Sequence, residues 1–114
     1  REDHIVPWDS AYASSQVGTG PATFVLGASG HIAGVINPPE KKKRGHWTNP
    51  ARRLPATGQQ WLASAQEHAG SWWPVWAEWL ASHAGDMVPA PRQPGSKQYP
   101  VIEAAPGRYV KRKA

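Results

Sequence analysis

The chain has 114 residues, of which only 17 are Leu, Ile, Val or Phe while 23 are Gly or Pro. This apolar content is low for a sizeable core, so we expect the chain to be part of a larger fold. A start at Arg1, with Met87 as the single methionine, agrees with that expectation. Without cysteine, the chain itself holds no disulfide, thiolate metal site or nucleophilic thiol. No apolar run reaches the roughly 18 residues of a membrane span. The net charge of +5 excludes neither a nucleic acid nor an anionic small molecule as partner.

The first elements predicted along the chain are a short helix and a short buried strand. Small and mixed residues from Ala11 to Val17, closed by Gly18, favour the helix. An apolar run from Thr23 to Leu26, bounded by turn residues, predicts the strand. The loop after this strand is rich in glycine and carries His31. Glycines there leave room for a ligand or another backbone segment to approach closely.

Two charged or proline-rich segments flank residues 58–84. Range 39–57 contains the run EKKKR and several prolines, and it predicts a basic loop. Range 85–114 has prolines and glycines spread throughout and ends in basic residues, which predicts an extended basic tail. No internal repeat is evident.

Two helices are predicted within 58–84, one over Gln59–His68 and one over Trp72–His83. Ser71 is a plausible N-cap of the second helix, and Pro74 falls in its first turn. Helical spacing places five side chains of the second helix in one stripe: Trp72, Trp76, Trp79, Leu80 and His83. We expect this stripe to be packed core rather than a surface for a hydrophobic polymer, with Trp73, which lies off the stripe, as the best candidate for exposure.

Asp3 and His31 are the residues best placed for chemistry. In α/β proteins, sites lie on loops at the carboxyl ends of strands, which is where His31 falls. Asp3 precedes the helix leading into that strand, so it would follow the previous parallel strand and lie near His31. An acid followed by a histidine matches the last two members of the Ser-Asp-His order of α/β hydrolases. Alternatively, Asp3 caps a turn and His31 is a core histidine bonded to a carbonyl.

Four stretches of the sequence resemble the C-terminal end of class I polyhydroxyalkanoate synthases, in the same order and at similar separations. They are REDHIVPW at 1–8, FVLGASGHIAGVINPPEKKKRGHWTN at 24–49, GSWWPVWAEWLA at 70–81 and APGRYVKRKA at 105–114. The resemblance implies an α/β fold, namely the C-terminal part of an α/β-hydrolase catalytic domain with its last strands and helices. On this division 1–38 carry the Asp and His loops with the last strand, 39–57 the basic loop, 58–84 the Trp-rich helices and 85–114 the tail.

The same resemblance implies a function and a set of site residues. Members of that family are cytoplasmic acyltransferases that polymerise (R)-3-hydroxyacyl-coenzyme A into a storage polyester on granules, as homodimers, without a separate cofactor. Their Cys-Asp-His triad assigns the aspartate to Asp3 and the histidine to His31, 28 positions later. The triad cysteine has no counterpart in this chain, so we expect the isolated chain to be inactive.

Other polar residues have weaker claims to a role. His4 could contact substrate, although neighbouring side chains on an extended segment point apart. Lys41, Lys42, Lys43 and Arg44 could meet the phosphates of coenzyme A, or form a solvated surface loop. The remaining histidines lack metal-ligand spacing, so no metal site is predicted. An alternative to the enzyme is a basic, Trp-rich module that binds polymer or nucleic acid without catalysis, nucleic acid being the less expected partner.

Overall fold

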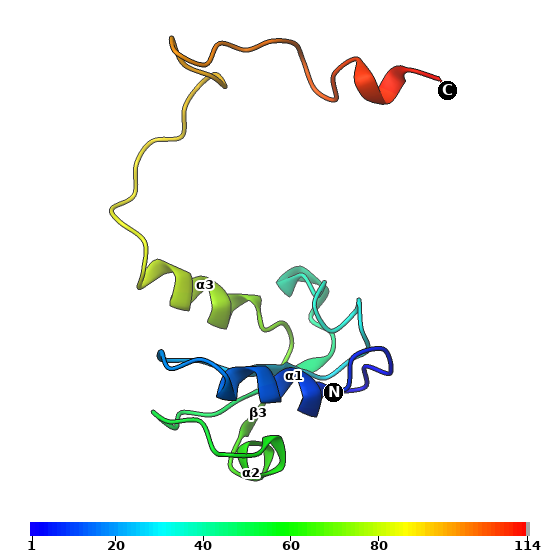
Figure 1. The fold of residues 1–114 in the computed structure, drawn as a ribbon, viewed down its shortest axis with the longest axis vertical. Helices are drawn as coiled ribbons and strands as arrows, with labels where there is room; N and C mark the ends of the chain where they lie inside the picture. Colours follow the sequence, from blue (N-terminus) through cyan, green and yellow to red (C-terminus); the bar gives the residue numbers. More distant parts are fainter. Residues whose placement is uncertain (114) are drawn as a thin grey trace. The chain divides into compact units, whose positions relative to one another are not determined.

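The computed structural model describes residues 1–113, which fall into two compact units, Arg1–Ala84 and the segment from Gly85 onward (Figure 1). The first unit contains helices and strands, and the second contains only turns and a short 3-10 helix. The helices of the first unit are α1 (Trp8–Ala13), α2 (Gly58–Ala63) and α3 (Trp73–Ala81), and the strands are β1 (Val25–Gly27), β2 (Gly45–Thr48) and β3 (Gln66–Ala69).

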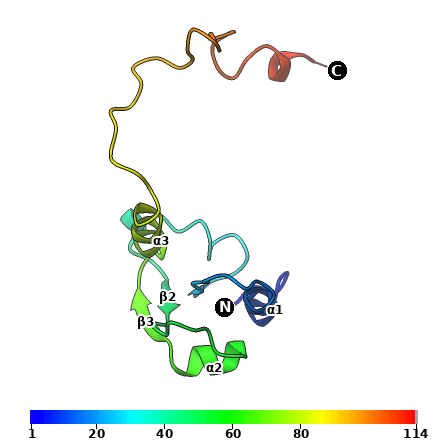
Figure 2. The ribbon, with the colours of Figure 1, turned by 60° about the vertical axis from the view of Figure 1, so that its left-hand side comes forward.

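The three strands form one antiparallel sheet in the order β1-β2-β3. Leu26 of β1 pairs with Trp47 of β2, and His46 of β2 pairs with His68 of β3. Figures 1 and 2 show α2 and α3 at opposite ends of this sheet. The helices with an antiparallel sheet confirm a mixed α and β composition. The parallel strand expected before Asp3 stays a prediction.

Two predictions from the sequence are wrong, because each of the two segments contributes a strand to the sheet. Range 39–57 is not only a basic loop, since it contains β2, whose Trp47 is buried in the core. The helix predicted over Gln59–His68 ends at Ala63, and the residues from Gln66 onward form β3 instead. The edge of β2 offers backbone partners to this segment, and that long-range pairing outweighs its local helical pattern.

The first helix begins earlier than its sequence predicts. It spans Trp8–Ala13, starting directly after Pro7, and it continues as a 3-10 helix over Ser14–Gln16. The predicted range of Ala11 to Val17 is therefore shifted by about one turn. The buried side chain of this helix is Tyr12, whose hydroxyl donates a hydrogen bond of 2.6 Å to the carbonyl of Pro55.

A small aromatic core lies between α1, α2 and the sheet. Its buried hydrophobic side chains are Tyr12, Leu26, Trp47 and Trp61, of which Tyr12 and Trp61 are fully buried. Phe24 contacts both Tyr12 and Trp61 edge-to-face, with ring centroids 4.9 and 5.0 Å apart. Helix α2, which carries Trp61, starts with a capping box in which Thr57 and Gln60 each accept a hydrogen bond from the other's backbone N–H.

Helix α3 begins at Trp73, one residue after its predicted start, with Trp72 at the N-cap position where Ser71 was predicted. The Ser71 hydroxyl accepts a hydrogen bond of 3.1 Å from the backbone N–H of Trp73, and Pro74 lies in the first turn. Trp73 is partly buried, so its expected exposure is wrong. Trp76 and Trp79 are 47% and 46% exposed within this chain, and packing of the stripe against the rest of a larger protein stays a prediction.

The three tryptophans of the stripe, Trp72, Trp76 and Trp79, line a groove. The groove lies between α3 and the segment entering β1 and has a volume of about 440 Å³. It is lined mainly by apolar side chains: Pro21, Phe24, Val25, Trp72, Val75, Trp76 and Trp79.

The second unit has little regular structure in its described residues. Its regular structure in the described residues is a 3-10 helix over Tyr109–Lys111. Its ion pair joins the guanidinium of Arg108 to the carboxylate of Glu103 at 3.3 Å. No helix among residues 1–113 combines the length and the hydropathy that crossing a membrane requires.

Candidate active site

The structure brings Asp3 and His31 together. Nδ1 of His31 lies 2.7 Å from Oδ2 of Asp3, within the range of a short, charge-assisted hydrogen bond. The two side chains are 44% and 19% exposed, so the imidazole reaches solvent while the carboxylate is largely covered. The predicted proximity of these residues is confirmed.

Asp3 is held by its own loop as well as by His31. Its Oδ1 accepts hydrogen bonds from the backbone N–H groups of Ile5 and Val6, at 2.8 and 2.9 Å. The bond from Val6, together with those from His31 and Ile5, lowers the pKa of Asp3 to about 2 against the opposing effect of desolvation. Asp3 is therefore a carboxylate at neutral pH, and its turn fixes the oxygen that faces His31.

His31 is presented by a tightly packed glycine loop after β1. A Cβ on Gly27 would lie 2.9 Å from the carbonyl oxygen of Gly34, and one on Gly34 would lie 2.9 Å from that of Ser29. A Cβ on Gly30 would meet the carbonyl oxygen of Glu2 at 3.6 Å, an ordinary contact. Close approach of another backbone segment, one of the two uses predicted for these glycines, is thus confirmed.

This geometry suits a histidine base oriented by a carboxylate. The carboxylate accepts the Nδ1 proton, which leaves Nε2 as the basic nitrogen. An oriented imidazole of this kind can take a proton from a nucleophile, and the carboxylate stabilises the imidazolium that forms. The chain itself contains no cysteine, and therefore no thiol nucleophile beside this pair.

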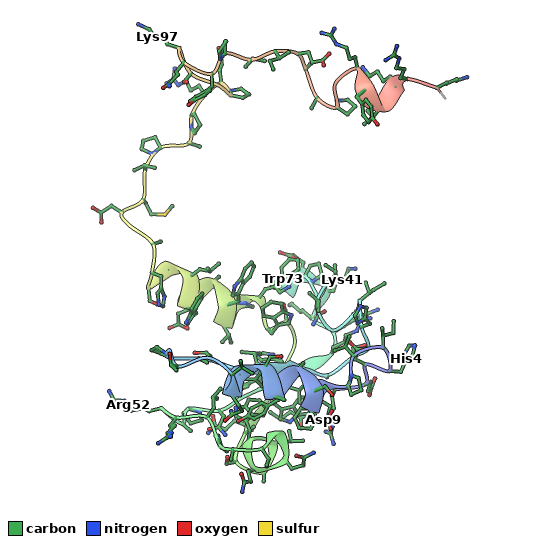
Figure 3. All side chains as sticks on the ribbon, in the orientation of Figure 1. His4, Asp9, Lys41, Arg52, Trp73 and Lys97 are labelled. Atoms are coloured by element: carbon green, nitrogen blue, oxygen red, sulfur yellow. The ribbon has the colours of Figure 1, made fainter. Side chains whose placement is uncertain are left out.

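The weaker candidates lie apart from this pair. His4 is exposed, and Figure 3 shows it at the edge of its unit. Lys41–Arg44 are also exposed, and in residues 1–113 no hydrogen bond or ion pair joins them to Asp3 or His31. The backbone of this run is anchored elsewhere: the side chain of Asn37 donates to the carbonyl of Lys43 at 3.1 Å, and Gly70 N–H donates to that of Arg44 at 2.8 Å.

A histidine pair on the sheet was not predicted. The rings of His46 and His68 stack with centroids 5.1 Å apart. Nδ1 of His46 lies 3.1 Å from the carbonyl oxygen of Gly70, and Nε2 of His68 lies 2.7 Å from the hydroxyl of Thr48. Within the described residues, no three His, Cys, Asp or Glu side chains gather as metal ligands. The pair could not be found from sequence because β3 was predicted as helix.

The sequence comparisons point to one group of enzymes, although no protein-family model matches the chain. The chain is 63% identical over 114 residues to a poly(3-hydroxyalkanoate) polymerase subunit PhaC from Cupriavidus necator. It is 47% identical over 112 residues to the subunit of that name from Rhizobium etli, and 41% identical over 108 residues to poly(3-hydroxyalkanoate) polymerase 2 from Ectopseudomonas oleovorans. These matches cover 100%, 96% and 95% of the chain but only 19%, 17% and 19% of the relatives.

Proposed function

Because the chain is related over its whole length to segments of poly(3-hydroxyalkanoate) polymerases, we propose that it carries the acid and base of such an enzyme's active site. The observation that carries this proposal is the 2.7 Å contact between His31 Nδ1 and Asp3 Oδ2 at the end of β1. The enzyme would be an acyltransferase that joins (R)-3-hydroxyacyl groups from coenzyme A thioesters into a polyester. The nucleophilic cysteine would come from a part of the protein outside this chain.

In the first step His31 acts as a general base. It takes the proton of the cysteine thiol through Nε2, because the thiolate rather than the thiol is the effective nucleophile. The thiolate attacks the thioester carbonyl, the carbon–sulfur bond to coenzyme A breaks, and coenzyme A leaves after accepting a proton. The acyl group is now a thioester of the enzyme.

In the second step a 3-hydroxyl group attacks an enzyme-bound acyl thioester and forms the new ester bond. The acyl carbon–sulfur bond to the cysteine breaks, and the hydroxyl proton passes through the base to the released cysteine thiolate. An alcohol is far less acidic than a thiol, so this step depends more on a fully oriented base. Asp3 contributes here through His31, whose imidazolium it stabilises, or by accepting the hydroxyl proton directly. No separate cofactor is needed, since coenzyme A arrives with the substrate.

The similarity to polymerases also supports roles for exposed residues of this chain and for the whole protein. Lys41–Arg44 are exposed cations that raise the local concentration of the anionic coenzyme A thioester, and His4 is a further candidate for substrate contact. The whole protein would act as a homodimer on polyester granules in the cytoplasm. The fold of the whole catalytic domain would be an α/β hydrolase, with this chain as its C-terminal part.

A second candidate is a binding module without catalysis. The half-exposed indoles of Trp76 and Trp79 in an apolar groove favour it, because such a surface could hold a hydrophobic polymer. This candidate predicts that His31 is dispensable, which the experiment below tests.

The test is single-turnover acylation and steady-state polymerisation in the full-length polymerase with labelled acyl-coenzyme A. We expect His31→Gln to lower acyl-enzyme formation by about 10²–10⁴-fold, the usual contribution of a general base. We expect Asp3→Asn to acylate more readily than His31→Gln but to stall before elongation.

Asp9→Asn is the matched control, because Asp9 is an exposed carboxylate on α1 and should leave both steps unchanged. Equal loss of acylation in His31→Gln and Asp3→Asn would mean that Asp3 only orients His31. Full polymerisation by His31→Gln would refute the catalytic proposal and favour the binding module.

A further inference from the structure

His31 begins a single helical turn that packs few of its own side chains. The N–H of Gly34 donates to the carbonyl of Gly30 at 2.8 Å, and the N–H of Ile36 donates to that of Ile32 at 2.8 Å. The three large side chains on the turn are mostly exposed: Ile32, Val35 and Ile36 at 72%, 55% and 56%. Side-chain burial therefore contributes little to holding this turn, and with it His31, in place.

Two indole groups from α3 bind the end of this turn. Nε1–H of Trp72 donates to the carbonyl of Gly34 at 3.1 Å and to that of Val35 at 3.2 Å. Nε1–H of Trp73 donates to the carbonyl of Val35 at 2.9 Å. The carbonyl of Val35 also accepts a local hydrogen bond of 3.2 Å from the backbone N–H of Asn37, so the indoles add contacts to this carbonyl and to that of Gly34 from 37 or 38 residues away.

The two indoles are themselves held in a fixed position. The hydroxyl of Ser71 caps the backbone N–H of Trp73, and the imidazole of the buried His46 lies 3.1 Å from the carbonyl oxygen of Gly70. The start of α3 is thus tied to β2, and the turn carrying His31 is tied to the start of α3. Gly27 and Gly34 complete the arrangement, because the absence of a side chain at each lets the backbone segments meet.

We propose that Trp72 and Trp73 are positioning residues for the active-site base: their indole N–H groups hold the helical turn so that His31 stays against Asp3. This inference rests on the proposed function of His31. It explains two adjacent tryptophans at the start of α3, because the N–H of each ring donates to a carbonyl of the turn. A rate that depends on a reacting group's placement falls steeply with small displacements, by about 10²-fold for a shift of about 1 Å.

The experiment replaces indole by phenyl, which keeps an aromatic ring and removes the donor. Trp72→Phe, Trp73→Phe and the double variant are made in the full-length polymerase, with Ala77→Ser and Glu78→Gln as controls. The control residues lie on the same helix, are exposed and do not line the groove. Acylation is measured in single turnovers, kcat and KM in the steady state, and hydrogen–deuterium exchange for the peptide covering 30–36.

We expect the double variant to acylate about 10- to 100-fold more slowly, with kcat falling and KM little changed. Amide exchange in 30–36 should become at least several-fold faster, while exchange in β2 and β3 stays as in the parent. The control variants should change neither readout. Unchanged exchange in 30–36 would overturn the inference, and so would faster exchange with an unchanged acylation rate.

Failure of the proposed function gives a different pattern. If His31→Gln acylates normally, His31 is not the base, and the exchange measurement alone still tells whether the indoles hold the turn. A loss of protection across β2 and β3 in the double variant would also overturn the inference, because the indoles would then support the whole unit rather than the turn.

Discussion

The contact of Gly34 with the loop before it leads to a sharp prediction about the His31 turn. A Cβ at position 34 would lie 2.9 Å from the carbonyl oxygen of Ser29 and 3.0 Å from that of Gly30. Both atoms belong to the backbone, so neither can rotate away as a side chain would. Gly34→Ala must therefore displace the turn that carries His31, and overpacking of this kind costs about 1–3 kcal/mol.

The assay compares Gly34→Ala with Gly20→Ala in the full-length protein, and it rests on the proposed function of His31. A Cβ at Gly20 would meet nothing within 4 Å, so this control should be neutral or stabilising by up to about 1 kcal/mol. We expect Gly34→Ala to lower the denaturant midpoint and to slow acylation by about 10²-fold, as displacement of the base requires. If Gly34→Ala matched Gly20→Ala in both measurements, the close packing of this loop would not position His31.

Three further predictions concern the core, the carboxylate and the isolated chain. Trp61→Ala should destabilise the full-length protein by about 3–5 kcal/mol in denaturant unfolding, because Trp61 is fully buried, whereas Trp79→Ala should cost much less; similar losses would refute this core assignment. Because the pKa of Asp3 is lowered from 3.8 to about 2, its stabilising contribution should be complete above about pH 4 and disappear as the pH falls toward 2. The Asp3 carboxyl carbon, followed by NMR, should therefore show no inflection near pH 4. The isolated chain should lack a sharp monomeric melting transition in calorimetry, because four buried hydrophobic side chains are few against about 1–2 kcal/mol of backbone ordering per residue; a cooperative melt would contradict this.

The sequence was informative where short-range chemistry decides the structure. Ser71 and Pro74 mark the start of α3, because a cap and a residue without N–H act on the turn next to them. The glycines around His31 predict close backbone approach, since they lack the side chain that would prevent it. The positions of Asp3 and His31 likewise predicted their contact. Asp3 precedes the helix that leads into β1 and His31 follows β1, and residues so placed on loops are expected to lie close together.

Long-range pairing decided what the sequence pattern did not show. Residues 66–69 have a helical pattern, yet β2 presents unpaired backbone groups beside them, and the resulting strand places His46 against His68. The tryptophan stripe has the spacing of a buried helix face, but periodicity does not say which surface a helix meets, and in the structure it faces a groove.

The sequence by itself therefore determined the resemblance to poly(3-hydroxyalkanoate) polymerases, the start of α3 to within one residue, and the proximity of Asp3 and His31. Only the tertiary structure decided that the indole N–H groups of Trp72 and Trp73 meet the turn after His31, 37 or 38 residues earlier in the chain. The physical reason is the separation along the chain over which each effect acts. Propensity, capping and periodicity act over a few residues, whereas backbone hydrogen bonds between distant segments depend on how the whole chain packs.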